Sequence, residues 1–229
     1  MSPAGWARLD SEIVGCRACP RLVAHREQVA RVKRAAFAGQ QYWGRPVPGF
    51  GDRRARVVLV GLAPAAHGAN RTGRMFTGDS SGDLLYRTLW ETGFASRPES
   101  ESLSDKLRLI DAYITAPVHC APPQNKPSRK EFQNCSCFFV EELVRLHHVQ
   151  VVVVLGRLAR DSYVGFLAQQ GKIRSPSSYP FRHGAVYSIA DAGVKLMCSY
   201  HPSRQNTQTG RLTTDMFGQV FAAAREELS

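Results

Sequence analysis

One stretch, Val57–Gly82, constrains the fold more than any other, because it turns a buried strand directly into a loop of small residues. The apolar run Arg56–Gly61 suits a strand that is covered on both sides. The run breaks at Gly61–Ala66, which reads GLAPAA and carries no bulky polar side chain. A turn of this kind lets a ligand approach the backbone closely. We therefore expect the chemistry of the protein to lie where this strand ends.

Similar apolar runs recur along the chain and alternate with segments of helical periodicity. Strands are predicted at Arg56–Gly61, Ala112–Ala116, Gln150–Leu155 and Val194–Tyr200, with a short edge strand at Gly184–Ala190. Helices are predicted at Trp6–Val14, Leu22–Ala36, Gly82–Thr92, Ser128–His147, Gly156–Gln169 and Leu212–Leu228. Such alternation is typical of a parallel sheet with helices on both faces. The sequence thus predicts an α/β fold with three layers around a central four-stranded parallel sheet.

Three loops are expected at the carboxyl edge of this sheet, where parallel sheets bind their ligands. They are Leu62–Asp79, Pro117–Pro127 and His201–Arg211. Two other segments are expected to be irregular. Phe37–Asp52 is rich in Gly, Pro and aromatic residues and predicts an ordered loop packed by its own rings. Ala95–Ser104 is polar and predicts a mobile excursion.

Length and charge limit the class of protein. The chain has 229 residues and no internal repeat, so one domain over residues 1–229 is expected. Lys and Arg number 30 against 19 Asp and Glu, a net charge of +11 that favours a polyanionic partner such as nucleic acid. No apolar run is long enough to span a membrane, and Asp10 and Glu12 stand where a signal peptide would be apolar. These features, together with the lack of heptads or a swapped arm, predict a cytosolic monomer.

Cysteines are the first candidates for a metal site. The chain has 6 cysteines and no secretion signal, so disulfides are the less favoured use. Cys16 and Cys19 form a C-x-x-C-P clip, while Cys120 and Cys135 bracket a Pro-rich loop and a helix start. These four thiols suit zinc or an iron–sulfur cluster, with four unrelated reduced thiols as the alternative. Cys137 is a weaker ligand candidate because it cannot easily share the direction of Cys135 on a helix, and Cys198 suits a buried strand position.

The loops carry the candidates for chemistry. His201 follows a strand and could donate a hydrogen bond to a developing anion, although an isolated His in a turn is more often a surface residue. Asp79 is a helix N-cap when it is considered alone. Phe76 suits either the core or a platform on which a planar ring stacks. The Gly-rich loop fits neither of the common phosphate-binding patterns. The polar residues after His201 suit phosphate and base edges, or simply a solvated loop.

Taken together, these motifs resemble the uracil-DNA glycosylase superfamily, and specifically its family 5, whose members carry an iron–sulfur cluster. The similar segments cover nearly the whole chain and occur in the right order. They are CRACP at Cys16–Pro20, YWGRPVPGFGD at Tyr42–Asp52, GLAPAAHGANRTGRMFTGD at Gly61–Asp79, CAPPQNKP at Cys120–Pro127 and HPSRQNTQTGRLT at His201–Thr213. The resemblance implies the fold of that superfamily and excision of uracil from DNA. It also implies a structural [4Fe–4S] cluster on Cys16, Cys19, Cys120 and Cys135.

Two positions depart from the related family 4. Ala116 stands where those enzymes have an Asn that bonds the uracil edge, and Leu62 stands where they have a Glu. The resemblance to family 5, together with the small side chain of Ala116, implies that hypoxanthine and xanthine are substrates beside uracil.

The resemblance also implies roles for individual residues. We expect His201 to stabilise the leaving base, Asp79 to orient or activate water, and Asn125 to assist. The expected base-binding residues are Leu62, Ala63, Ala65, Ala66, His67, Phe76 and Ala116. The expected contacts to duplex or single-stranded DNA are Arg71, Arg74, Ser203, Arg204, Gln205, Asn206 and Arg211. The alternative function is a non-catalytic nucleic-acid-binding module that uses the four cysteines for zinc.

Overall fold

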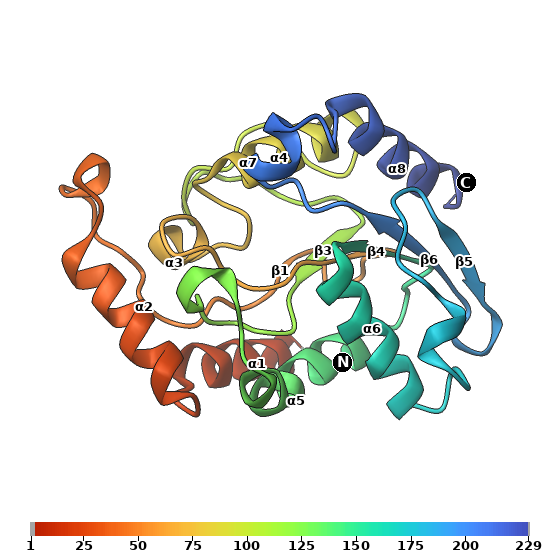
Figure 1. Cartoon of the computed structure of the whole chain (residues 1–229), viewed down its shortest axis with the longest axis horizontal. Coiled ribbons are helices and arrows are strands. Elements are labelled where there is room, and N and C mark those ends of the chain that lie inside the picture. Colours follow the sequence, from red (N-terminus) through yellow and green to blue (C-terminus); the bar gives the residue numbers. More distant parts are fainter. Residues whose placement is uncertain (1–2, 229) are drawn as a thin grey trace.

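A computed structural model describes residues 3–228, and they fold around one mixed sheet (Figure 1). The strands are β1 (Phe50–Gly51), β2 (Val57–Val60), β3 (Ala112–Thr115), β4 (Val151–Leu155), β5 (Val186–Ile189) and β6 (Val194–Ser199). Within the described residues they form a six-stranded sheet in the order β1-β3-β2-β4-β6-β5. The central strands β3, β2, β4 and β6 are parallel, which confirms the predicted four-stranded core. The edge strands β1 and β5 run antiparallel to their neighbours.

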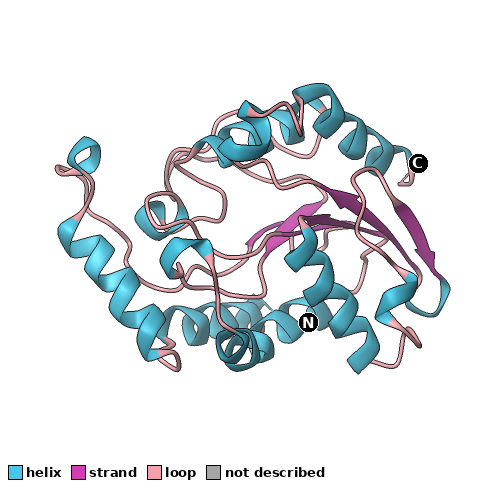
Figure 2. Ribbon diagram, viewed as in Figure 1, coloured by secondary structure: helices cyan, strands magenta, loops and turns pink. Residues whose placement is uncertain are grey.

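Eight α-helices are found in the described chain, and they cover both faces of the sheet (Figure 2). They are α1 (Pro3–Gly15), α2 (Pro20–Val32), α3 (Ala69–Thr72), α4 (Ser80–Glu91), α5 (Arg129–Arg145), α6 (Arg157–Gln169), α7 (Arg204–Gln208) and α8 (Thr214–Glu226). On one face, β2 packs Leu59 against α4 and α8. On the other, Val58 and Val60 pack against α1, α5 and α6. Because successive strand residues point to opposite faces, each buried strand must be apolar throughout, and this is the pattern that predicted the strands.

Local signals explain where the longer helices begin. Ser128 accepts a hydrogen bond from the backbone N–H of Glu131, whose carboxylate accepts one from the N–H of Ser128. This reciprocal cap confirms the predicted start of α5. Thr213 caps α8 by accepting from the N–H of Met216. The helices that flank the sheet therefore match the sequence prediction to within a few residues.

The register of the sheet places the three predicted loops at one edge. Val60 lies opposite Thr115 on one side and Val154 on the other. The chain therefore leaves neighbouring strands at the same level, and residues 61–79, 116–127 and 200–213 converge there. Helix α2 stands apart from the layers, on the left of Figure 1, and packs through Leu22 against Val118 and Cys120.

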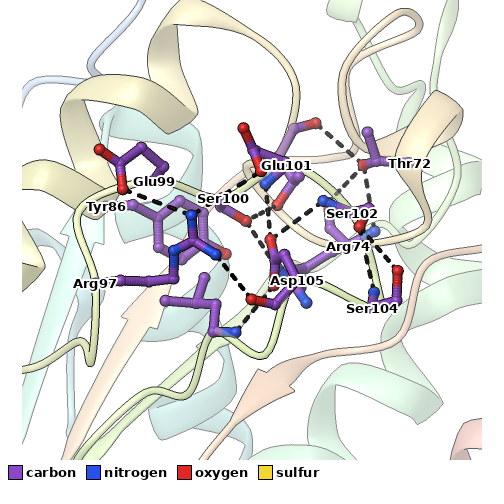
Figure 3. Close-up of polar contacts among 12 residues, drawn as sticks. Thr72, Arg74, Tyr86, Arg97, Glu99, Ser100, Glu101, Ser102, Ser104 and Asp105 are labelled. Atoms are coloured by element: carbon purple, nitrogen blue, oxygen red, sulfur yellow. Dashed lines mark hydrogen bonds and ion pairs between the residues drawn. The ribbon is translucent and has the colours of Figure 1, made fainter.

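Two segments that were expected to be irregular differ from the prediction. Phe37–Asp52 contains β1, where Gly51 adopts φ +141° and a Cβ atom would lie 2.4 Å from the carbonyl oxygen of Ala112. A strand of two residues that depends on glycine gives no periodic signal. The prediction of a mobile Ala95–Ser104 excursion is wrong. A network around Asp105, described below, fixes this segment instead (Figure 3).

Candidate functional site

A cavity of about 340 Å³ opens where the three loops meet. Ten of the predicted residues line it, namely Leu62, Ala63, Ala65, Phe76, Asp79, Ala116, Asn125, His201, Ser203 and Gln205. It is also lined by five residues that the sequence did not single out, namely Pro64, Ala69, Met75, Ser81 and Gln124. Pro64, Ala69 and Met75 lie inside the motif Gly61–Asp79, and Gln124 lies inside CAPPQNKP, so these motifs could have indicated them, whereas Ser81 gave no signal. The cavity therefore joins residues that lie more than 100 positions apart in sequence.

Phe76 is held rigidly at one side of this cavity. Its backbone is left-handed, with φ 53°, a conformation that costs a bulky residue about 1–3 kcal/mol. Two glycines make room for it. A Cβ on Gly61 would lie 2.8 Å from the Phe76 ring, and one on Gly82 would lie 1.6 Å from its carbonyl oxygen. The preceding residue is fixed as well, because Tyr86 donates its hydroxyl to the carbonyl of Met75 at 2.8 Å. The ring is thus preorganised before any ligand binds.

His201 lies beside Phe76, with the two ring centroids 5.7 Å apart and the planes at 29°. It lies two residues after the end of β6 and is fixed through its backbone. Its carbonyl accepts from the N–H of Ser203 and from Nδ2 of Asn206, both at 2.8 Å. Burial lowers the pKa of His201 below its ordinary value, and the negative charge of Asp79 opposes this shift in part. The imidazole is therefore neutral near pH 7 and able to donate one hydrogen bond into the cavity.

Asp79 is both the helix cap and a wall of the cavity. Its Oδ1 accepts from the N–H groups of Ser81 at 3.0 Å and Gly82 at 3.1 Å, so it begins α4. Both cap bonds use Oδ1, and Oδ2 lies against the backbone of Gly68, where a Cβ would come within 2.1 Å. The cap fixes the carboxylate in one orientation. Oδ1 thus makes two structural hydrogen bonds, whereas Oδ2 makes neither of them, and the residue lines the cavity.

Asn125 and Gln124 form the third side of the cavity. Both are exposed non-glycine residues in the left-handed region, with φ 55° and 56°. They lie on the 3-10 turn Pro123–Asn125, which is closed by a bond from the N–H of Asn125 to the carbonyl of Pro122. Strained turns of this kind persist where the surrounding chain fixes them, and they are common at functional sites. The turn presents two amide side chains to the cavity.

Two predicted base-binding residues, Ala66 and His67, do not line the cavity. Nδ1 of His67 is 3.0 Å from the hydroxyl of Tyr42. Burial, followed by the nearby Arg34 and Arg71, lowers the pKa of His67. His67 is thus placed to hold the Tyr42 segment against the loop.

Two predicted phosphate contacts, Arg71 and Arg74, bond within the protein. Arg71 donates to the carbonyls of His67 and Gly78, each at 2.8 Å, and its guanidinium lies 3.9 Å from the centroid of the Phe37 ring. Arg74 is 3% exposed and ion-paired with Asp105. The expectation that Arg74 binds a DNA phosphate is therefore wrong for this structure, because its guanidinium is enclosed by the protein.

Figure 3 shows the surroundings of Asp105. Arg74 Nη1 donates to both carboxylate oxygens, at 2.8 and 2.7 Å, and the N–H groups of Glu101 and Leu107 donate at 2.8 and 2.9 Å. Burial by itself would raise the pKa of Asp105, but these hydrogen bonds outweigh it and hold the pKa at about 2. The network fastens residues 97–107 to the end of the loop that carries Phe76.

Among the remaining predicted DNA contacts, Ser203 and Gln205 line the cavity, and Asn206 and Arg211 line a second cavity beside it. The segment expected to be a loop contains α7, which Ser203 caps by accepting from the N–H of Asn206 at 3.4 Å. Arg204, Gln205 and Arg211 are exposed. A second cavity of about 610 Å³ adjoins the first at His201. It is lined by Gly156, Arg157, Phe181, Arg182, His183, Tyr200, His201, Asn206, Arg211 and Met216. Basic and aromatic side chains thus extend from the candidate site along one face.

The four candidate cysteines come together near the start of α2. Cys120 and Cys135 are buried, and Cys16 and Cys19 are partly exposed. Burial raises the pKa of Cys120 to about 11 and that of Cys135 further, and both Cys16 and Cys19 add to each shift. Contacts also bring the four together: Cys19 packs against Cys120, Arg26 contacts both Cys120 and the carbonyl of Cys16, and Cys135 accepts from the residue before Cys120.

Nitrogen donors surround the sulfurs. Arg26 Nη1 donates to Cys120 Sγ at 2.8 Å, the N–H of His119 to Cys135 Sγ at 3.4 Å, and Asn134 Nδ2 to Cys19 Sγ at 3.5 Å. Such donors stabilise thiolates and are typical of cluster sites. In residues 3–228, however, no group of three or more His, Cys, Asp or Glu side chains is spaced to hold one metal ion.

The other two cysteines, Cys137 and Cys198, have different environments. Cys137 is exposed, and its Sγ is 3.7 Å from the carbonyl of Asn134. Cys198 is fully buried in β6, as its strand position predicts.

No helix in the described chain is long and apolar enough to cross a membrane.

Comparison with known proteins gives consistent matches. The sequence pattern of the uracil DNA glycosylase superfamily matches residues 48–225. A type-5 uracil-DNA glycosylase of Thermus thermophilus is 54% identical over 213 residues, covering 93% of this chain and 94% of the relative. The type-5 enzyme of Mycobacterium bovis is 48% identical over 95% of this chain and 80% of its own length. That of Pyrobaculum aerophilum is 43% identical over 97% of this chain and 94% of the relative.

Proposed function

The chain belongs to the uracil-DNA glycosylase superfamily, and from this premise we propose that it removes uracil, hypoxanthine and xanthine from DNA by hydrolysing the N-glycosidic bond. The observation that carries the proposal is the meeting of Phe76, Asp79 and His201 in one cavity. The target base leaves the duplex to enter this cavity, because neither C1′ nor the base edge is accessible in a stacked helix. The product is an abasic site, which other enzymes of base excision repair then process.

The reaction divides into loss of the base and addition of water. The bond between C1′ and the base nitrogen breaks with its electron pair on the base, leaving an oxocarbenium-like sugar. The neutral His201 donates a hydrogen bond to the base anion, and the Phe76 ring supports the planar base. Water then adds to C1′ and gives its proton to Oδ2 of Asp79, from which it passes to the departing base. The carboxylate also stabilises the positive sugar while it exists.

The walls of the cavity bear on the choice of base. Ala65 and Ala116 are small, and the volume of about 340 Å³ leaves space for a purine as well as a pyrimidine. Asn125 and Gln124 bring amide groups that donate and accept, and these groups suit the oxygen-bearing edges shared by deaminated bases. Uracil, hypoxanthine and xanthine all present such an edge, whereas adenine and cytosine present an amino group there.

DNA binds across the cavity mouth. Arg204 and Gln205 on α7 enter the space that the flipped base leaves, while Ser203 and Asn206 fix α7 and His201. Arg211 lies 4.5 Å from the Tyr200 ring centroid and carries the basic surface into the second cavity. Because the protein has a net charge of +11, its affinity for DNA falls steeply as the salt concentration rises. The enzyme acts as a monomer in the prokaryotic cytosol.

Cys16, Cys19, Cys120 and Cys135 hold a [4Fe–4S] cluster in this proposal. The nitrogen donors to Cys19, Cys120 and Cys135 support this assignment, because such donors stabilise thiolates. The group supplies structure and no step of the hydrolysis. The clip Cys16-x-x-Cys19 is not matched by a second C-x-x-C, so a zinc ribbon is a poor fit for the non-catalytic alternative.

One panel of substrates tests the function. Purified protein is incubated with duplexes that contain a single uracil, hypoxanthine, xanthine, cytosine or adenine, and alkali then cleaves abasic sites. We expect cleavage with the first three and none with the last two. Binding without any cleavage would support the non-catalytic alternative, and cleavage of uracil alone would remove the purines from the proposal.

A further inference from the structure

Arg26 is buried in α2 although no ion pair to a carboxylate is found for it in the described chain. It is 2% exposed, and Nη1 donates to Cys120 Sγ at 2.8 Å while Nη2 donates to the carbonyl of Cys16 at 3.1 Å. A buried guanidinium is costly unless a negative charge lies beside it. Its environment is therefore complementary to thiolates held by a metal centre and not to neutral thiols.

The same residue contacts the base-binding loop through its backbone. The carbonyl of Arg26 accepts from Nδ2 of Asn70 at 3.2 Å, and Asn70 is completely buried. Asn70 also fastens the loop itself, since its N–H donates to the carbonyl of Ala65 at 3.0 Å and its carbonyl accepts from the N–H of Gly44 at 3.0 Å. α2 and α3, which carry these two residues, lie beside each other in Figure 1.

The loop held by Asn70 forms one wall of the candidate active site. Ala65 lines the cavity, and the backbone of Gly68 lies against Oδ2 of Asp79. A displacement of this loop therefore moves the carboxylate that is placed to activate water. A continuous set of contacts leads from Cys120 through Arg26 and Asn70 to Asp79.

We propose that Arg26 and Asn70 are positioning residues that couple the four-cysteine centre to the base pocket. The inference rests on the proposed function. Coupling between two sites is reciprocal, so if the centre positions the pocket, occupation of the pocket must stabilise the centre. The four-cysteine centre then does more than hold α2 in place, because the position of Asp79 depends on an intact centre.

Reciprocity gives a measurement that does not depend on catalysis. The holoprotein is titrated to equilibrium with an iron chelator, and the chelator concentration that removes half of the visible cluster absorbance is measured with and without a duplex carrying a tetrahydrofuran abasic-site analogue. We expect the duplex to raise this concentration by about fivefold or more in the unchanged protein, the lower range of known couplings. Asn70→Ala should begin with the same iron content and show almost no protection by DNA.

Arg21 offers a matched control on the same helix. It pairs with Glu131 at 2.6 Å near the cysteines and has no described contact with Asn70. Arg21→Met should lower the chelator concentration that removes half of the cluster, but DNA should still raise that concentration by the same factor as in the unchanged protein. Arg26→Lys keeps the charge but cannot contact both Cys120 and the carbonyl of Cys16, so DNA should no longer protect the cluster in this variant. It provides a second test if Asn70→Ala does not fold.

Two outcomes overturn the proposal. One is an unchanged protein whose cluster DNA does not protect, and the other is protection that survives in both Asn70→Ala and Arg26→Lys. Either result with normal excision in the substrate panel would leave the proposed function intact. Absence of excision with full protection would instead reject the function and keep the coupling.

Discussion

Replacing Asp79 by Asn separates the two roles that the structure gives to this residue. Oδ1 caps α4 through Ser81 and Gly82, and the residue also lines the cavity together with His201. Asn keeps a side-chain oxygen for the cap but removes the carboxylate charge and the proton acceptor. Asp79→Ala removes both and serves as the comparison.

The expected effects on stability follow from the cap. Asn and Asp are about equally good N-caps, so Asp79→Asn should change the free energy of unfolding by only a few tenths of a kcal/mol. Asp79→Ala should lower that free energy by about 1 kcal/mol. For a chain of this size the loss corresponds to a fall in Tm of about 2–4 °C. Thermal unfolding of both variants measures the difference.

The expected effect on excision is far larger. Loss of a positioned general base typically lowers the rate by about 10²–10⁴-fold. Single-turnover excision from a uracil duplex, with enzyme in excess, measures this without a contribution from product release. The excision rates of the Asp79→Asn and Asp79→Ala variants should be reduced to a similar degree, and both variants should bind the abasic-site analogue as the unchanged protein does.

The contrast between the two variants shows whether Asp79 has a catalytic role or only caps α4. If Asp79→Asn excised uracil at nearly the normal rate while Asp79→Ala lost both stability and activity, Asp79 would be a helix cap alone. Another group in the cavity would then have to activate water, and the amide of Asn125 would be the next candidate to test.

Other predictions concern pH, the buried ion pair and the cysteines. Burial lowers the pKa of His201, so the rate of excision should fall only when the pH is below about 6.5, the ordinary pKa of histidine. Asp79→Asn removes the charge that opposes this shift, so the acid side of the pH–rate profile should move to lower pH. The unfolded chain protonates this His first, so stability should also decrease as pH falls through that window. Arg74→Met should destabilise the fold by about 3–5 kcal/mol in denaturant titration, because Asp105 keeps an unpaired buried charge. An unchanged midpoint would contradict this. The stability that Asp105 contributes is complete above its unfolded pKa of 3.8 and should be lost as pH falls toward about 2. Cys16→Ser should lose iron and the visible absorbance, whereas Cys137→Ser should keep both, and equal iron contents would contradict the ligand assignment.

The sequence determined the main framework because its signals are local or periodic. β2 and β4 are apolar throughout, as strands covered on both faces must be. The Ser128 and Glu131 pair marked the start of α5, and C-x-x-C-P together with the loop motifs indicated the family. From strand order and motif position the meeting of Asp79 and His201 could be expected, since both follow parallel strands.

Only the tertiary structure decided how individual side chains are used. Arg74 reads in sequence as one more basic residue of a DNA-binding loop, but Asp105, 31 positions away, encloses its charge. Asn70 gives no signal, since its partners are a carbonyl on α2 and the backbone of its own loop. From the sequence, Asp79 could be a helix cap or a catalytic residue, and in the folded chain it caps α4 through Oδ1 and also lines the cavity. Periodicity and motifs describe what each segment prefers by itself, whereas these roles depend on which distant atoms the folded chain brings within hydrogen-bond reach.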